Sequence, residues 1–272
     1  MIKRFVTIIF FAGSTLFGQV DFFPGDLNIQ PFTANILEPR LGFLFQNRND
    51  ELRLDIGNSF DILHYHDDSK TFSVGADLFT YTLLRSEDNF HFPVDAVDYL
   101  FGINFAYKVR VHNYSFGFRA RISHISAHFA DGHYDNAKQT WRDGQNPRVY
   151  SREFIEVMPF YRYNNFRFYF GLTYIFHVEP DYVKKDQYHA GFDYFRKDFI
   201  AENISPFIAY DFKYTTVKSR FANHSISAGI KFGEVFGRGI SLYYNYYDGN
   251  NFHGEYFDQK SEYSAIGINL DL

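Results

Sequence analysis

The sequence predicts an all-β fold, an up-and-down antiparallel transmembrane β-barrel of about twelve strands. Two neighbouring segments, 97–108 and 113–128, alternate strictly between large apolar residues and small, polar or charged ones. Such alternation is typical of a strand with two unlike faces, here an apolar face toward lipid and a polar face toward a lumen. Aromatic residues make up 21% of the chain, with 35 Phe and 22 Tyr, which fits the aromatic girdles of membrane barrels.

A soluble lipocalin-type barrel or a β-sandwich is the alternative fold class. In either fold the aromatic faces would have to share one small interior. The opposite faces would then meet water, yet they carry Gly, Ser, Ala and Asn more often than the Lys, Glu and Thr expected of a soluble sheet. These faces therefore favour the membrane barrel.

The N-terminal region predicts export. Residues 1–19 have the features of a signal peptide, with a basic start, an apolar run and Gly18 before the expected cut. Residues 20–39 are rich in Pro and turn residues, with a short helical possibility near 32–37, and we expect a periplasmic lead-in or a plug. Residues 40–272 form the predicted barrel, which assigns the chain to the bacterial outer membrane.

The expected strands follow one another with short turns and longer polar loops alternating between them. Their ranges are roughly 40–46, 51–63, 71–83, 97–108, 113–128, 149–163, 166–178, 188–196, 205–214, 222–232, 239–247 and 262–272. An even number leaves both chain ends in the periplasm. The last strand resembles the terminal strand that the barrel-insertion machinery recognises, so this machinery is an expected partner, although the chain ends in Leu272 and not in an aromatic residue.

Charged residues fall on the inward faces of several expected strands. They are Asp77, Asp98, Arg119, Arg121, Arg152, Glu156 and Arg162. Because an isolated buried charge is very costly, these side chains are expected to pair with one another and to fill the lumen. This argues against an open solute channel.

Four short segments carry a family resemblance. They are Phe23-Pro-Gly-Asp26, Asn35-Ile-Leu-Glu-Pro-Arg40, Arg121-Ile-Ser-His-Ile-Ser-Ala-His128 and Tyr150-Ser-Arg-Glu153. Together they resemble a family of bacterial outer-membrane proteins, the domain of unknown function 1207, from about Phe23 to the C-terminus. That family has no established activity, so the resemblance implies fold and location.

A looser resemblance, to outer-membrane phospholipase A and lipid A deacylase barrels, bears on function. Those enzymes carry His-x-Ser on the outer face of a strand, and an Asn or Glu on the next strand orients the His. Here His124-Ile-Ser126 supplies the pair on one face, and a symmetric hairpin would put Glu153 opposite His124. The resemblance then implies Ser126 as nucleophile, His124 as base and Glu153 as the orienting carboxylate. The substrate would be an outer-membrane lipid, either lipopolysaccharide or phospholipid.

The chain departs from both enzyme families at the residue after the Ser and in its longer gap from the Ser to the third residue, which is twenty-seven positions here. Both carry Asn directly after the Ser, whereas this chain has Ala127. The pattern also names no oxyanion hole, although such donors supply much of the rate enhancement of acyl transfer.

Structural readings of the same segment remain open. His124, Ser126 and His128 lie near the loop end of their strand, where polar residues at the headgroup interface cost little. Ser126 and Ser151 would face each other and could hydrogen-bond across the strands. A loop metal site with His128, Asp131 and His133 is a further reading, but no metal or cofactor is predicted.

Two classes of function follow. The primary interpretation is a structural or binding role in the cell envelope without chemistry. The alternative is a lipid esterase that uses Ser126, His124 and Glu153. With a net charge of −5 the chain offers no basic footprint for nucleic acid.

Overall fold

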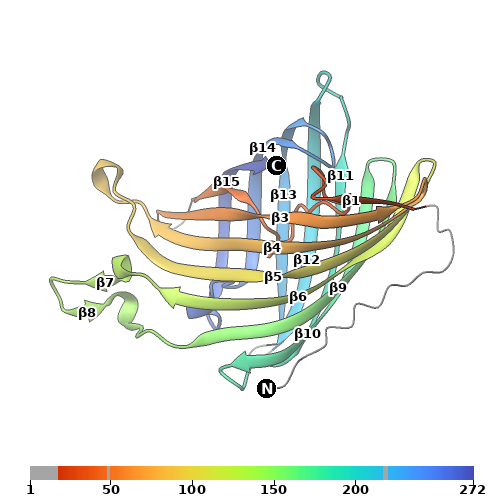
Figure 1. Cartoon of the computed structure of the whole chain (residues 1–272). Helices are drawn as coiled ribbons and strands as arrows, with labels where there is room; N and C mark the ends of the chain where they lie inside the picture. Colours follow the sequence, from red (N-terminus) through yellow and green to blue (C-terminus); the bar gives the residue numbers. More distant parts are fainter. Residues whose placement is uncertain (1–17, 48–49, 217–219) are drawn as a thin grey trace, which may run out of the picture.

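The computed structural model describes residues 18–47, 50–216 and 220–272. The predicted signal peptide therefore lies outside the described residues, except for its last two positions. Within the described part, twelve long strands form one antiparallel barrel (Figure 1). These strands are β2 (Leu41–Gln46), β3 (Glu51–His66), β4 (Lys70–Arg85), β5 (Val94–Val111), β6 (Tyr114–Phe129), β9 (Tyr150–Tyr163), β10 (Phe166–Glu179), β11 (Asp186–Phe195), β12 (Ile204–Thr216), β13 (Arg220–Gly233), β14 (Gly239–Asn250) and β15 (Lys260–Asp271).

Smaller elements complete the described part of the chain. Three short strands are β1 (Gln19–Phe22), β7 (Tyr134–Asp135) and β8 (Thr140–Trp141), and the 3₁₀ turns are Asp88–Phe90, Asp131–His133, Arg142–Gly144 and Gly254–Tyr256. Among the described residues, no helix is long and apolar enough to cross a membrane.

The barrel closes between its first and last long strands. Strand β2 pairs with β15, where Phe45 lies opposite Ile266, and on its other side with β3. The β1 strand, which the sequence did not predict, extends this edge by pairing with the end of β3, with Gln19 opposite His66. Closure satisfies the backbone groups that an open sheet would leave unpaired in lipid.

The two faces of the barrel differ as the period-two alternation predicts. Large apolar side chains cover the outside, among them Phe45, Ile56, Leu78, Phe101, Phe116, Phe168, Phe170, Leu172, Ile208, Leu242 and Ile266. Buried polar and charged side chains fill the inside, among them Arg53, Asp55, Asp77, Asp98, Arg119, Arg121, Glu156, Arg167 and Asp193. This inverse arrangement, apolar outside and polar inside, is that of a membrane barrel.

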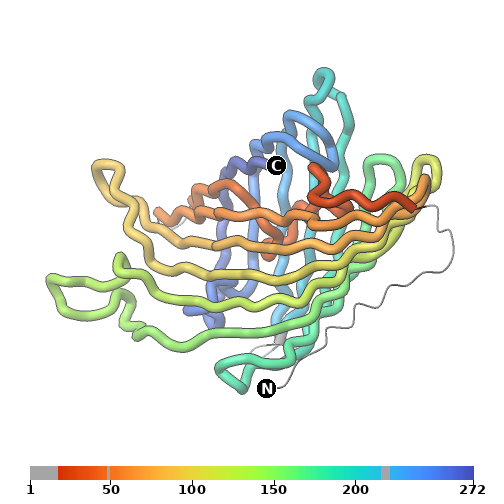
Figure 2. Tube along the Cα trace, viewed as in Figure 1, coloured from red at the N-terminus to blue at the C-terminus, as the bar shows by residue number. Residues whose placement is uncertain are grey.

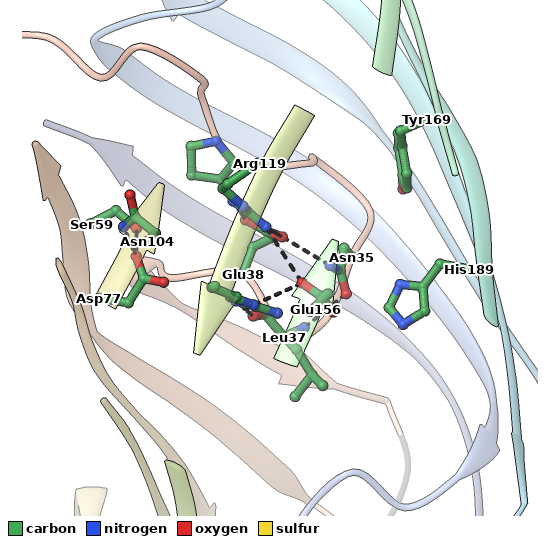
Figure 3. A network of polar contacts seen from close by, with 12 residues as sticks. Asn35, Leu37, Glu38, Ser59, Asp77, Asn104, Arg119, Glu156, Tyr169 and His189 are labelled. Carbon is green, nitrogen blue, oxygen red and sulfur yellow. Dashed lines mark hydrogen bonds and ion pairs between the residues drawn. The ribbon is translucent and has the colours of Figure 1, made fainter. Parts of the chain in front are cut away.

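The chain between β1 and β2 enters the barrel, and its residues 28–40, which we call the inner segment, lie inside. Phe32, Asn35 and Glu38 are fully buried there, and Figure 3 shows Glu38 and Asn35 among side chains that project from the barrel wall. Residues 33–34 and 36–37 form turns, and residues 32–37 contain no helix, so the helical possibility in this stretch is wrong. Its backbone carbonyls are instead satisfied by the wall: Arg121 donates to the carbonyl of Leu37 at 3.1 Å.

Most of the predicted inward charges are paired. Arg121 Nε lies 2.7 Å from Glu156 Oε1, while Asp77 accepts a hydrogen bond from Asn104 at 2.8 Å. Arg152 and Arg162 are the exceptions, because neither makes an ion pair or a hydrogen bond with a carboxylate among the described residues. Pairing of this kind lowers the cost of charges in a lumen filled by side chains.

The loops differ in length at the two ends of the barrel. The loop 130–149 carries the β7–β8 hairpin and projects from one end, as the trace in Figure 2 shows. At this end lie also the connections 86–93, 180–185 and 251–259, whereas the turn at Asn164–Asn165 closes the other end. The end with long loops is the extracellular one in outer-membrane barrels.

Candidate functional site on the outer face

Three neighbouring strands, β6, β9 and β10, bring polar side chains together on the outer face of the barrel. The register of β6 and β9 puts His124 opposite Glu153 and Ser126 opposite Ser151. This is the register that the sequence predicts from a symmetric hairpin around the loop 130–149. Since the side chains of a cross-strand pair lie on one face, the imidazole and the carboxylate meet.

His124 is held from two sides. Its Nδ1 donates a hydrogen bond to Glu153 Oε1 at 2.5 Å. On the other side its ring packs on that of Phe101 from β5, with centroids 4.9 Å apart. Both polar side chains are about a quarter exposed, 27% for His124 and 28% for Glu153, so a molecule at the outer surface can reach them.

A second histidine binds the same carboxylate. His177 from β10 donates through Nδ1 to Glu153 Oε2 at 2.5 Å and is 67% exposed. Sequence reasoning missed it, because uninterrupted alternation along β10 puts position 177 on the inward face. A β-bulge between Ile175 and His177 adds one residue to the strand, so that His177 faces outward and lies opposite Glu153.

Ser126 lies on the same outer face, two residues after His124. It is flanked by Tyr99 on β5 and Ser151 on β9 in the registers of these strands. Within the described residues, no hydrogen bond joins Ser126 to His124 or to Ser151. The serine and the imidazole thus share a face without contact in the unliganded chain, and catalytic hydrogen bonds are often long before a substrate binds.

The arrangement fixes the tautomer of the neutral imidazole. A carboxylate can only accept, so Glu153 holds the proton of His124 on Nδ1 and leaves Nε2 with a lone pair. In a serine hydrolase the carboxylate has this role, and the free nitrogen takes the proton of the nucleophile.

His133, one of the three residues considered as ligands of a loop metal site, lies away from the outer-face site. His133 is 1% exposed, stacks on Phe129 with centroids 4.2 Å apart and lies 3.2 Å from Asp95. Among the described residues, no group of three or more His, Cys, Asp or Glu is arranged to hold a metal ion.

Known proteins resemble this chain in two ways. The model of a family described as "Protein of unknown function (DUF1207)" matches residues 69–272. No curated protein matches the chain in sequence. Among solved structures, outer membrane phospholipase A from Escherichia coli is similar with a TM-score of 0.55 at 11% identity, covering 89% of this chain and 93% of that chain.

Two other barrels resemble the chain more distantly. The beta domain of the Bordetella autotransporter Brka has a TM-score of 0.44 at 12% identity, over 85% of this chain and 97% of its own. Outer-membrane OmpT of Vibrio cholerae has a TM-score of 0.40 at 10% identity, over 95% and 99%. The family match, the closed barrel and its apolar outer face all indicate the bacterial outer membrane. The chain is a bacterial outer-membrane β-barrel and belongs to the family of unknown function DUF1207.

Proposed function

We propose that this barrel is an outer-membrane lipid esterase with Ser126 as nucleophile, His124 as general base and Glu153 as the carboxylate that orients His124. One observation carries the proposal: the 2.5 Å contact between His124 Nδ1 and Glu153 Oε1, with Ser126 on the same outward face. A structural role alone does not require this combination on a face that is otherwise largely apolar.

The expected reaction has two steps. Ser126 Oγ attacks the acyl carbonyl of a lipid ester while His124 Nε2 accepts the hydroxyl proton, and the acyl–oxygen bond breaks as the proton passes to the leaving alcohol. Water then attacks the acyl-serine, with His124 again taking and returning a proton, and releases the fatty acid. Glu153 stabilises the imidazolium that forms in each step.

The surroundings of the three residues support a lipid substrate. The site opens sideways on the outer face, beside Tyr99 and Phe101, which are 46% and 52% exposed. An acyl chain would lie along this apolar band, with its ester near the extracellular loops. The E. coli barrel of similar fold is by its title a phospholipase, which supports phospholipid as a substrate class.

Acyl release from phosphatidylethanolamine vesicles and from purified lipid A tests the proposal, with refolded wild-type barrel and the variant Ser126→Ala. Ser151→Ala is the matched control, since Ser151 lies opposite Ser126 on the same face. We expect release by the wild type and by Ser151→Ala and none by Ser126→Ala. If the folded wild type releases no acyl chain from either lipid, with or without calcium, the esterase is excluded and the envelope role without chemistry is favoured.

A further inference from the structure

A second candidate site lies inside the barrel, away from the outer-face triad. A cavity lined by Val183, Asn251 and Phe257 opens toward the extracellular loops. Its floor is the inner segment at Ile36 and Leu37, and its wall comes from strands β9, β11, β12, β13 and β14, including Arg152 of β9 and Lys213 of β12.

Two cations in the wall of this cavity lack carboxylate partners. Lys213 is 5% exposed, and its ammonium makes one long hydrogen bond, of 3.4 Å, to Asn35 Oδ1. Arg152 packs its guanidinium near the rings of Tyr150 and Phe154, at 5.9 and 5.7 Å. Neither makes an ion pair with a carboxylate in the described part of the chain. A buried cation without a close anion is costly unless something else neutralises it.

Among the described residues that line the cavity, Asp211 alone carries a carboxylate, and this carboxylate is already engaged. Asp211 Oδ2 accepts a hydrogen bond from the hydroxyl of Tyr169 at 2.9 Å and lies 3.9 Å from the imidazole of His189. A further donor points to a ligand, because Asn250 is 7% exposed and its Nδ2 has no partner among the described groups. The polar lining is therefore rich in unused donors and poor in free acceptors, which suits an anion.

Aromatic rings supply the rest of the wall. Tyr150 stacks on Phe257 with centroids 5.0 Å apart, and Tyr247 meets Phe252 edge-on at 6.3 Å. Flat apolar surfaces beside a few convergent polar groups are the usual composition of a site for a small organic molecule. An inorganic anion would leave these ring faces without contact.

From this juxtaposition we infer that the extracellular half of the lumen binds a small organic carboxylate, with its charge between Arg152 and Lys213 and its ring or alkyl face on the aromatic wall. The site is independent of the proposed esterase, because its residues face the lumen and those of the triad face outward. Ligand binding here requires no acyl transfer.

Isothermal titration calorimetry on the refolded full-length barrel tests the inference with benzoate and its neutral isostere benzamide. We expect benzoate to bind at least about tenfold more tightly than benzamide. Lys213→Met and Arg152→Met should each weaken benzoate binding by at least about tenfold. The matched control is Lys231→Met, since Lys231 lies at a different cavity and is paired with Asp271 at 2.8 Å.

The outcomes separate the two proposals. Equal affinities for benzoate and benzamide, or no heat with either, would overturn the carboxylate site without bearing on the esterase. The comparison of the two ligands uses the unmodified protein, so it stands even when a variant does not fold. Benzoate binding by Ser126→Ala with unchanged affinity would support a site separate from the triad, and its loss in that variant would contradict the inference.

Discussion

Glu38 of the inner segment and Arg119 of β6 form a bidentate ion pair in the middle of the lumen. Arg119 Nη1 donates to Glu38 Oε2 at 2.7 Å and Nη2 to Oε1 at 2.5 Å, with both side chains buried (Figure 3). Glu38 Oε1 also accepts from the Asn35 amide at 2.9 Å. The pair thus joins the inner segment to the barrel wall and orders the local turn around it.

The first prediction concerns this pair. Glu38→Gln should lower the free energy of unfolding by about 3–5 kcal/mol, because it leaves the buried guanidinium of Arg119 without its main counter-charge. Glu156, 3.8 Å from Arg119, can offset only part of this loss. Urea unfolding of the refolded barrel in lipid measures the change. Glu202→Gln, at an exposed position in the turn between β11 and β12, is the control, and equal stability of the two variants would contradict the prediction.

A second prediction follows from the proposed esterase. Glu153→Gln should lower the rate of acyl release by about 10²–10⁴-fold, since the neutral amide cannot stabilise the imidazolium of His124. The measurement is kcat on phosphatidylethanolamine at saturating lipid. Full activity of this variant would exclude Glu153 from the mechanism even where Ser126 proves essential.

The third prediction treats His177 as a positioning residue that acts through Glu153. His177→Ala should lower kcat by about tenfold, because removing a residue that positions a functional side chain typically costs activity on this scale. In a Glu153→Gln background the same change should have no further effect, because the two residues act as one unit. Additive losses across this double-mutant cycle would show that His177 acts independently of the carboxylate.

A fourth prediction concerns how the loop 130–149 is held at the mouth of the barrel. Arg148 pairs with Asp258 at 2.6 Å and donates to the carbonyl of Glu255 at 2.9 Å. Arg148→Met should release the loop from 251–259. Trp141, the single tryptophan of the chain, lies in this loop, and its ring centroid is 6.1 Å from that of Phe129. Its fluorescence therefore reports how the loop packs.

Acrylamide quenching of the Trp141 fluorescence measures this release. We expect a larger quenching constant for Arg148→Met than for the wild type. Lys138→Met is the control, because Lys138 is 77% exposed and lies 3.6 Å from Asp135 within the same loop. Unchanged quenching in the Arg148 variant would mean that other contacts hold the loop.

The sequence by itself determined the barrel and the meeting of His124 with Glu153. Alternation is a local property, because every second residue of β5 and β6 must be apolar when one face meets lipid. A hairpin around one loop then relates two strands by simple counting, which suffices to pair position 124 with position 153.

Only the tertiary structure decided the position of the inner segment, the pairing of β1 and the orientation of His177. The inner segment carries no periodic signal, and its place depends on wall residues more than eighty positions away, such as Arg119 for Glu38. The bulge in β10 shifts the alternation by one residue at a point where nothing local marks it. Long-range pairing between strands, and not the local sequence pattern, selects such features. The sequence alone therefore does not show that His177 belongs to the site.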